Sequence, residues 1–123
     1  NFDIKIEQKD YINTSGRPIQ LKRAFQNIID NSSRYADKIL IKIFINENGY
    51  NIEFHDNGKG IPTDKYEDVF KPFFTLDPAR NKLKGESGLG LTITRDIIRS
   101  HGGEIKLSKS ELGGLKLLVL LPT

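Results

Sequence analysis

Two segments of the chain repeat apolar residues at the spacing of an amphipathic helix. The first begins near Pro18, a residue suited to the first turn of a helix. Its apolar positions recur at i, i+3, i+4, i+7 and i+8, which predicts one buried stripe: Leu21, Ala24, Phe25, Ile28 and Ile29. The second segment covers roughly residues 88–101 and ends at Gly102-Gly103. Its apolar set is Leu89, Leu91, Ile93, Ile97 and Ile98.

Alternating apolar positions predict three strands in the first half of the chain. Apolar residues alternate over residues 2–6, which indicates an opening strand. The run ILIKIFI puts four isoleucines on one face, and the Asn48-Gly49 that follows is typical of a tight hairpin. The returning strand carries Ile52 and Phe54 inward and ends at the segment HDNGKGIP.

The rest of the chain completes an α/β pattern. The segment TDKYEDVF is predicted to be a short helix, and two further strands, at about 104–108 and 115–121, are joined by Gly113-Gly114. The predicted fold is an α/β two-layer sandwich, with a mixed, mostly antiparallel five-stranded sheet and about three helices on one face. At 123 residues, the length suits one domain over residues 1–123.

Composition narrows the classes of function. The chain is 37% hydrophobic and 28% charged, as in an ordinary globular protein. A net charge of +3 does not argue for nucleic acid, which usually needs a clustered basic face. Cysteine is absent, which excludes disulfides and fits a reducing compartment. No apolar run of about 18 residues occurs, so we expect no membrane contact. Methionine is absent and the chain begins mid-strand, so we expect a fragment of a longer protein.

A row of polar residues runs beside the apolar stripe of the first helix. Asn27, Asn31, Arg34 and Tyr35 follow the helical spacing. They are rotated from the stripe by about one residue, or ~100° at 3.6 residues per turn. Two amides one turn apart, next to a buried stripe, need an explanation.

The segment DNGKGI directly follows a predicted strand. Counting back by twos, Asp56 shares the inward face with Ile52 and Phe54. A carboxylate at the edge of the core costs free energy unless it has hydrogen-bond donors, so Asp56 is a candidate binding residue. Gly58 and Gly60 allow the backbone to approach a ligand closely. An ordinary Asp-Asn-Gly turn explains the segment equally well.

The segment GESGLGLT places Gly88 and Gly90 at the start of the second helix. Free N–H groups at a helix N-terminus, together with glycines, can form an anion site. A flexible loop followed by a helix cap is an equal alternative. The segment is not a Walker loop, because no Gly-Lys-Ser/Thr follows, and it is not a Rossmann fingerprint.

Residues 75–87 have no clear period and are predicted to form a lid over a site. Arg80, Lys82 and Lys84 within this segment are candidates for phosphate contacts. For the two lysines, a solvated loop is the favoured interpretation.

The two histidines carry little weight as site residues. His55 alternates to the face opposite Asp56, so we expect it to point outward. His101 lies at the end of the second helix, where it complements the helix dipole. The sequence has no cluster of His, Cys and carboxylates at the spacing of a metal site.

Four motifs follow one another along the chain: NIIDNSSRY, DNGKGI, FKPFF and GLGL. This order resembles the N box, first glycine box, F box and second glycine box of the ATP-binding catalytic domain of sensor histidine kinases. That domain has the Bergerat fold and belongs to a superfamily with gyrase, Hsp90 and MutL. The resemblance extends from about residue 17 to 121, and it looks closest to the osmolarity-sensor type of bacterial kinase.

The resemblance implies a role for each motif residue, with ATP and Mg²⁺ as cofactors. Asn31 would offer its carbonyl oxygen to the Mg²⁺ that bridges the phosphates, while Asn27 and Arg34 would face the phosphates. Asp56 would accept a hydrogen bond from the adenine amino group, and Arg80 would reach the γ-phosphate. The catalytic residues would be Asn27, Asn31 and Arg80. The remaining ATP contacts would come from Tyr35 beside the nucleotide, Gly58 and Gly60, Ile61 with Phe70 and Phe73 as pocket wall or lid support, and Gly88, Leu89 and Gly90 around the phosphate chain.

The chain departs from the family pattern at two positions. Glu86 stands where the second glycine box usually has a glycine two residues before Gly88. A carboxylate near phosphates is unexpected there and bears on how the lid closes. Ser32 stands where alanine is commoner, which is a milder change.

Asn27 bears on the choice between phosphoryl transfer and hydrolysis. Gyrase-like and Hsp90-like relatives have a glutamate at this position as the general base, whereas an amide cannot take up a proton at neutral pH. A protein that passes the γ-phosphoryl group to another residue gains by not activating water. We therefore expect a protein-histidine kinase. The alternatives are an ATPase of the same fold, a non-catalytic ATP-sensing or docking module, and a serine kinase of the anti-sigma type.

The resemblance also implies partners. Kinases of this family phosphorylate a histidine on a separate two-helix dimerisation domain, in a His-Glu/Asp context followed by proline. His55 is followed by Asp56 but lies in the glycine-box region, so we do not expect it to be the acceptor. The expected partners are the histidine-bearing dimerisation domain of the same protein and, through the full-length kinase, a response regulator. The expected location is the cytoplasm, with the full-length protein anchored in the inner membrane.

Overall fold

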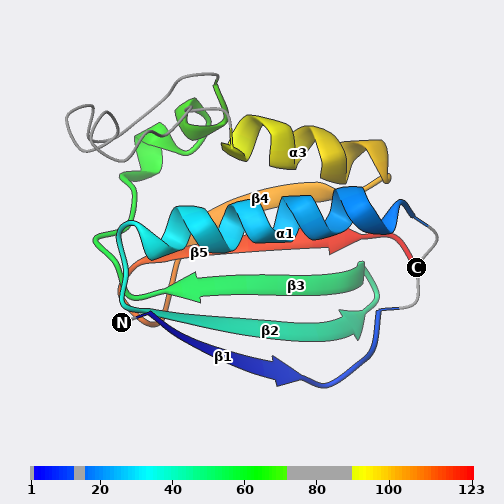
Figure 1. The fold of residues 1–123 in the computed structure, drawn as a ribbon, viewed down its shortest axis with the longest axis horizontal. Helices are drawn as coiled ribbons and strands as arrows, with labels where there is room; N and C mark the ends of the chain where they lie inside the picture. The colour runs from blue at the N-terminus through cyan, green and yellow to red at the C-terminus, as the bar shows by residue number, and fades with distance from the viewer. Residues whose placement is uncertain (1, 13–15, 72–89) are drawn as a thin grey trace.

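The computed structural model describes residues 2–12, 16–71 and 90–123. Its strands are β1 (Asp3–Gln8), β2 (Lys38–Asn46), β3 (Gly49–Asp56), β4 (Glu104–Lys109) and β5 (Leu115–Leu121). They form one sheet in the order β1-β2-β3-β5-β4 (Figure 1). β1 pairs with β2 in parallel, and the other neighbours are antiparallel. The predicted mixed, mostly antiparallel five-stranded sheet is confirmed.

Two helices, α1 (Pro18–Ser33) and α3 (Gly90–Ser100), lie side by side over one face of the sheet (Figure 1). The predicted two-layer sandwich is therefore confirmed. The short helix expected at TDKYEDVF is instead two single 3-10 turns, η1 (Thr63–Lys65) and η2 (Asp68–Phe70). A segment this short gains too few helical hydrogen bonds to offset nucleation. Residues 88 and 89, expected at the start of the second helix, lie outside the described residues, as does the expected lid over 75–87.

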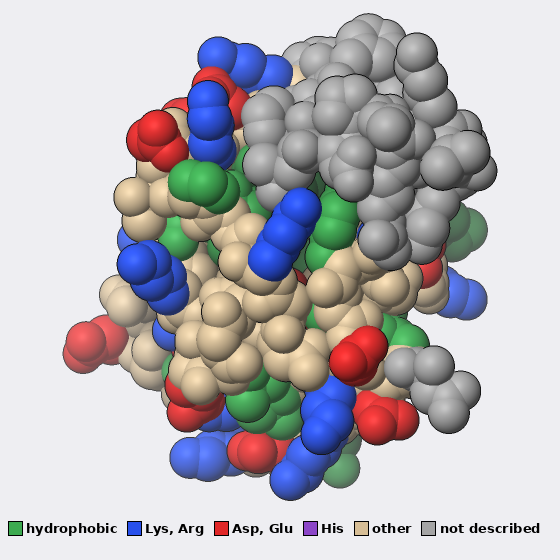
Figure 2. Space-filling view, turned by 90° about the vertical axis from the view of Figure 1, so that its left-hand side faces the viewer, with side chains coloured by type: hydrophobic (Ala, Val, Ile, Leu, Met, Phe, Trp, Pro, Cys, Tyr) green, Lys and Arg blue, Asp and Glu red, His purple; other side chains and the backbone are tan. Residues whose placement is uncertain are grey.

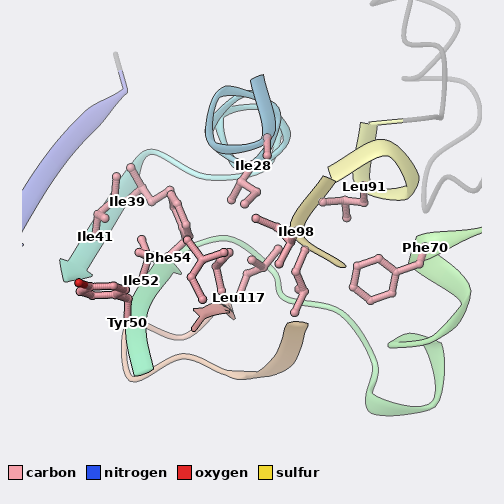
Figure 3. Packing of buried hydrophobic residues seen from close by; sticks show 14 of the residues in the cluster. Ile28, Ile39, Ile41, Tyr50, Ile52, Phe54, Phe70, Leu91, Ile98 and Leu117 are labelled. Carbon is pink, nitrogen blue, oxygen red and sulfur yellow. The ribbon is translucent and has the colours of Figure 1, made fainter. Parts of the chain in front are cut away.

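The hydrophobic core lies between the helices and the sheet. Ile28 of α1 and Ile98 of α3 point toward Phe54 and Leu117 on the central strands (Figure 3). The predicted stripe of α1 faces this core, with Ala24 and Ile28 buried and Leu21, Phe25 and Ile29 partly buried. Burying an aliphatic or aromatic side chain of this size contributes roughly 1.5–3 kcal/mol to folding. The core therefore fixes the position of α1, and with it the polar row along the helix.

The β2–β3 hairpin sets the register that positions the end of β3. Asn46 pairs with Gly49, so the turn has two residues, and Ile39 pairs with Asp56 at the other end. Gly49 has a φ of 117°, and a Cβ there would collide with the carbonyl oxygen of Leu121, so glycine is required. Directly paired residues lie on the same face of a sheet, so Asp56 faces the helix layer as Ile39 does.

Alternation predicted the strands correctly but not their burial at the sheet edge. β1 lies beyond the area that the two helices cover (Figure 1). As a result Ile4 is 48% exposed and Ile6 is 58% exposed, although both alternate as core residues do. Within the described ranges, neither helix is long and apolar enough to cross a membrane.

Candidate functional site

Asp56 is the last residue of β3 and is only 8% exposed. Its Oδ1 accepts hydrogen bonds from the backbone N–H of Gly58 at 3.0 Å and of Leu115 at 3.0 Å. These donors offset the cost of removing the carboxylate from water. The predicted inward orientation of Asp56 is confirmed. The donors come from the glycine segment and from the start of β5.

Glycines allow the backbone to approach Asp56 closely. The N–H of Gly114 donates to the carbonyl oxygen of Asp56 at 3.1 Å, and a Cβ at Gly114 would collide with the carboxylate. A Cβ at Gly58 would lie 2.8 Å from the carbonyl oxygen of Tyr35. Gly60 has a φ of 73°, which favours glycine. Sequence reasoning treated Gly114 only as a turn residue and missed Leu115, because it had no means to place the β4–β5 turn beside β3.

Asn57 joins the glycine segment to the start of β2. Its Oδ1 accepts from the backbone N–H groups of Asp37 at 2.9 Å and Lys38 at 3.0 Å. Its own N–H donates to the carbonyl oxygen of Lys38 at 3.3 Å. Sequence reasoning assigned Asn57 no role. These bonds bring the chain that follows α1 next to the first glycine box, which places Tyr35 beside Gly58.

The predicted polar row lies along α1 and the residues that follow it. Asn27, Asn31, Arg34 and Tyr35 are all half-buried. The ammonium of Lys59 lies 5.4 Å from the centre of the Tyr35 ring, in cation–π contact. Ile61 is half-buried and packs against the hydrophobic core. The structure thus brings the end of the N-box helix and the first glycine box to the same end of the sheet.

The F box is attached to α3. Phe70 is buried, and its carbonyl oxygen accepts a hydrogen bond from the hydroxyl of Thr92. The Arg95 guanidinium lies 4.2 Å from the centre of the Phe70 ring and pairs with Glu67 at 3.1 Å. Phe70 therefore fixes η2 against the helix layer. Gly90 is the first residue of α3. The predicted site residues Phe73, Arg80, Gly88 and Leu89 lie outside the described residues.

His55 lies on the face opposite Asp56, as predicted, but it is not exposed on that face, because only 4% of the residue is accessible to solvent. Its Nδ1 lies 2.9 Å from Ser110 Oγ, and its Nε2 lies 2.9 Å from Glu53 Oε1. The turn between β4 and β5 covers it, which alternation within β3 alone cannot reveal. Burial by itself would raise the pKa of Glu53, but hydrogen bonds from His55 and Lys116 outweigh it and keep that pKa below its ordinary value.

His101 lies just beyond α3, as predicted for a residue that complements the helix end. Its Nδ1 lies 2.8 Å from the carbonyl oxygen of Ile97, to which it donates. Its Nε2 accepts from the backbone N–H of Arg17 at 2.9 Å. His101 therefore joins the end of α3 to the start of α1. Within the described part of the chain, no group of three or more His, Cys, Asp or Glu residues is placed to hold a metal.

The end of the molecule at which β3 terminates carries charges of both signs. Figure 2 shows Lys and Arg side chains interspersed there with Asp and Glu side chains, with hydrophobic side chains between them. A ligand at this end would meet local groups rather than one uniform field, because opposite charges close together largely cancel at a distance.

Comparison with known proteins gives a consistent result. Residues 16–123 match the family described as histidine kinase-, DNA gyrase B-, and HSP90-like ATPase. The sensor histidine kinase CpxA of Escherichia coli (strain K12) is 38% identical over 108 residues, which are 87% of this chain and 24% of CpxA. The sensor protein kinase WalK of Staphylococcus aureus is 34% identical over 120 residues, which are 93% of this chain and 29% of WalK. This chain thus spans about a quarter of the length of these relatives.

A solved structure supports the same assignment of fold. The crystal structure of the ATP binding domain of PrrB from Mycobacterium tuberculosis is similar to this chain with a TM-score of 0.74 and 26% sequence identity. The similarity covers 98% of this chain and 80% of that one.

Proposed function

Since the chain belongs to the family of histidine kinase-, DNA gyrase B- and HSP90-like ATPases, we propose that it is the ATP-binding catalytic domain of a sensor histidine kinase. In this role it binds Mg-ATP and transfers the γ-phosphoryl group to a histidine on a separate helical domain. The observation that carries the proposal is the buried Asp56 carboxylate, whose Oδ1 accepts from two backbone N–H groups. A carboxylate fixed in this way suits recognition of a hydrogen-bond donor, and the adenine amino group is one.

The base is expected to bind at the end of β3. Among the described residues, both backbone N–H groups that donate to the Asp56 carboxylate bond to Oδ1, so Oδ2 is the oxygen that would accept from the adenine amino group. Gly58 brings the backbone close to the Asp56 carboxylate, Gly60 lies close to Gly114, and Ile61 would supply an apolar wall. Tyr35 lies next to Gly58 and would flank the nucleotide.

The phosphates are expected to lie along the polar row of α1. Asn31 would offer a neutral carbonyl oxygen to Mg²⁺, which prefers oxygen ligands and usually keeps several waters and phosphate oxygens. When bound, the metal supplies neutralisation of the charge that develops on the phosphates. Asn27 and Arg34 would contact the phosphates from the same helix end. Arg80 and the segment Gly88–Gly90 complete the set, on the basis of the family motif.

The acceptor is expected to lie on another domain, because both histidines of the chain are engaged. His55 is buried with both ring nitrogens bonded, to Glu53 and Ser110. The ring nitrogens of His101 bond to Ile97 and Arg17. In the transfer, the bond from the γ-phosphorus to the bridging oxygen breaks, a bond to the acceptor nitrogen forms, and ADP leaves.

The proposed partners follow from this division of roles. The chain would act with the histidine-bearing dimerisation domain of the same protein and, through the full-length kinase, with a response regulator. We expect it to lie in the cytoplasm, with the full-length protein anchored in the inner membrane.

A transfer assay with radiolabelled ATP tests the proposal. We expect the chain alone to bind Mg-ATP, release phosphate very slowly and take up no label. With the matching helical domain added, label should pass to the histidine of that domain and require Mg²⁺. Asn31→Ala should abolish transfer, whereas Asn48→Ala in the β2–β3 turn, at the other end of β3 from Asp56, should not. Rapid phosphate release by the chain alone would favour the ATPase alternative. Binding without transfer would favour a non-catalytic module.

A further inference from the structure

A buried polar network lies on the face of the sheet that the helices do not cover. His55 precedes Asp56 in β3 and points to the opposite face; its Nε2 lies 2.9 Å from Glu53 and its Nδ1 2.9 Å from Ser110. A carboxylate only accepts, so Nε2 donates to Glu53, and in the neutral ring Nδ1 then accepts from the Ser110 hydroxyl. The Ser110 oxygen accepts in turn from the N–H of Leu112 at 3.0 Å. Each of these polar atoms therefore has a partner in one tautomer of the ring.

The network secures the turn between β4 and β5. Ser110 is the first residue after β4; its N–H donates to the carbonyl oxygen of Gly114 at 2.8 Å, and its own carbonyl accepts from the N–H of Gly113 at 3.0 Å. A second side-chain tie from this turn to the sheet is the pair Lys42–Glu111, at 2.7 Å, in which Glu111 is 60% exposed. Exposed ion pairs contribute little because water screens them. The buried bond between His55 and Ser110 is the stronger tie.

The same turn contacts Asp56 from the other side of the strand. The N–H of Gly114 donates to the carbonyl oxygen of Asp56, and the N–H of Leu115 donates to its Oδ1. Because His55 and Asp56 are neighbours in β3, adjacent residues contact one turn from opposite faces of the sheet. A shift of the turn would remove one of the two donors to Oδ1 and allow the carboxylate to rotate.

A catalytic interpretation of the network is not supported. Ser110, His55 and Glu53 are the residue types of a hydrolytic triad, in which the serine oxygen must reach a substrate. Ser110 is buried, and its oxygen already accepts from Leu112. The arrangement therefore acts on structure rather than on a substrate of its own.

We propose that His55 is a positioning residue for base selectivity. Through Ser110 it fixes the β4–β5 turn, so that Leu115 keeps Oδ1 of Asp56 engaged and Oδ2 directed at the amino group of the base. A 6-aminopurine triphosphate donates to this oxygen, whereas a 6-oxopurine triphosphate presents an acceptor to it. The inference rests on the proposed function, since it assumes that the Asp56 site takes a nucleotide.

Three variants separate the two bonds of the His55 ring. His55→Gln can still donate to Glu53 from its terminal amide but has no acceptor near the Nδ1 position, so it loses the Ser110 bond. His55→Asn places its amide oxygen near the Nδ1 position and keeps an acceptor for Ser110. Glu53→Gln keeps an acceptor for Nε2 and disturbs the pairing with Lys116, but it leaves the bond between His55 and Ser110 in place. It is the matched control within the same network.

The first readout is the ratio of the ATP and inosine triphosphate dissociation constants, measured by calorimetry on the 123-residue chain. In His55→Gln we expect ATP binding to weaken about tenfold, the effect of losing a hydrogen bond to a charged group, with little change for inosine triphosphate. His55→Asn and Glu53→Gln should keep the wild-type ratio. An unchanged ratio in His55→Gln would overturn the proposal, and if both nucleotides bound more weakly by the same factor, His55 would have a role in stability alone.

The second readout needs no nucleotide. We expect amide exchange at Leu115 to accelerate in His55→Gln but not in Glu53→Gln, because the N–H that donates to Asp56 is released only when the turn shifts. If the wild-type chain binds neither nucleotide, the proposed function fails, and this exchange still tests the positioning role. Unchanged protection of Leu115 in His55→Gln would overturn that role. If His55→Gln does not fold, Ser110→Ala replaces it, because this variant removes the same bond. A wild-type ratio of dissociation constants together with wild-type protection of Leu115 in Ser110→Ala would then overturn the positioning role.

Discussion

At the residue scale, the two carboxylate oxygens of Asp56 have different surroundings. Oδ1 accepts from the backbone N–H groups of Gly58 and Leu115, and we expect Oδ2 to accept from the adenine amino group. In Asp56→Asn the amide oxygen would take the place of Oδ1, because only an oxygen can accept from these two donors. The amide nitrogen would then direct its hydrogens at the adenine amino group, so that one donor faces another.

Asp56→Asn should therefore weaken ATP binding by about 2 kcal/mol or more, which is roughly 30-fold. The same variant should bind inosine triphosphate more tightly than the wild-type chain does, because the 6-oxo group accepts from the new amide. Calorimetry with both nucleotides measures the two changes, and thermal unfolding checks that the fold is kept. An ATP affinity of Asp56→Asn within about twofold of wild type would contradict the proposal that Asp56 binds the adenine amino group.

The lowered pKa of Glu53 predicts that the stability of the fold depends on pH in a specific way. Burial would raise its pKa, but hydrogen bonds from His55 and Lys116 outweigh burial and lower the pKa in the folded state. A carboxyl group whose pKa is lower in the folded state than in the unfolded state stabilises the fold when it is ionised. This contribution to the free energy of unfolding is present above the unfolded-state pKa, about 4.3 for glutamate. That stability is lost as the pH falls through the lower, folded-state pKa.

We expect the wild-type chain to lose more stability than Glu53→Gln as the pH falls below about 4.3, because the glutamine has no proton to take up. Urea unfolding at a series of pH values measures the free energy of unfolding of both proteins, and their difference isolates Glu53 from the other carboxylates. Parallel curves for the two proteins would show that the Glu53 carboxylate is not stabilised by folding.

At the element scale, the two helices are joined at the end opposite the candidate site. The His101 ring bonds the carbonyl oxygen of Ile97 at the end of α3 and the backbone N–H of Arg17 at the start of α1. The Arg17 guanidinium also donates to Ser100 at 2.6 Å. A Cβ at Gly16 would lie 2.8 Å from the His101 ring, so this junction is closely packed. It fixes the start of the helix that carries the polar row.

His101→Ala should lower the free energy of unfolding by roughly 1–3 kcal/mol, because it removes two hydrogen bonds and leaves the Arg17 N–H without its acceptor. The matched control is Arg99→Ala, which removes an exposed ion pair with Glu104 and should cost about 0–1 kcal/mol. Thermal and urea unfolding of both variants give the comparison. Equal effects of the two substitutions would mean that the junction does not stabilise the helix pair.

The same scale shows which parts of the fold the sequence can predict. Periodicity within one element predicts its type and its inner face, as the stripe of α1 and the inward Asp56 demonstrate. It cannot predict what lies over that face. Ile4 and Ile6 alternate as core residues but lie beyond the helices, whereas His55 alternates outward and is covered by the β4–β5 turn.

The residues of the candidate site likewise fall into those that the sequence predicts and those that it does not. Asp56, Gly58 and Gly60 were predicted because they stand together in one motif at the end of a strand. Leu115 and Gly114 were missed because they come within hydrogen-bonding distance of Asp56 only when β5 pairs with β3. Contacts between segments far apart in sequence have no local signal in a single chain.

At the scale of the whole molecule, the proposed reaction depends on an amide, and not a general base, at position 27. Asn27 lies one turn before Asn31 on α1 and is half-buried at the candidate phosphate position. Its amide cannot take a proton from water, so bound ATP would keep its γ-phosphoryl group until an acceptor histidine arrives from another domain. An amide in place of a base at position 27 would thus preserve the phosphoryl group for transfer.

Placing a carboxylate at position 27 should shift the balance toward hydrolysis. With saturating Mg-ATP, phosphate release by Asn27→Glu alone should rise at least about tenfold over wild type. This is below the roughly 10²–10⁴-fold that a well-positioned general base supplies, because the rest of the site is not built to orient water. Asn27→Gln is the matched control, since it has the same length without a base, and it should not rise. Because a carboxylate also repels the phosphates, the comparison is made on the turnover rate at saturation and not on affinity. Equal rates in the glutamate and glutamine variants would mean that position 27 does not reach the attacking water, and that something other than Asn27 decides between transfer and hydrolysis.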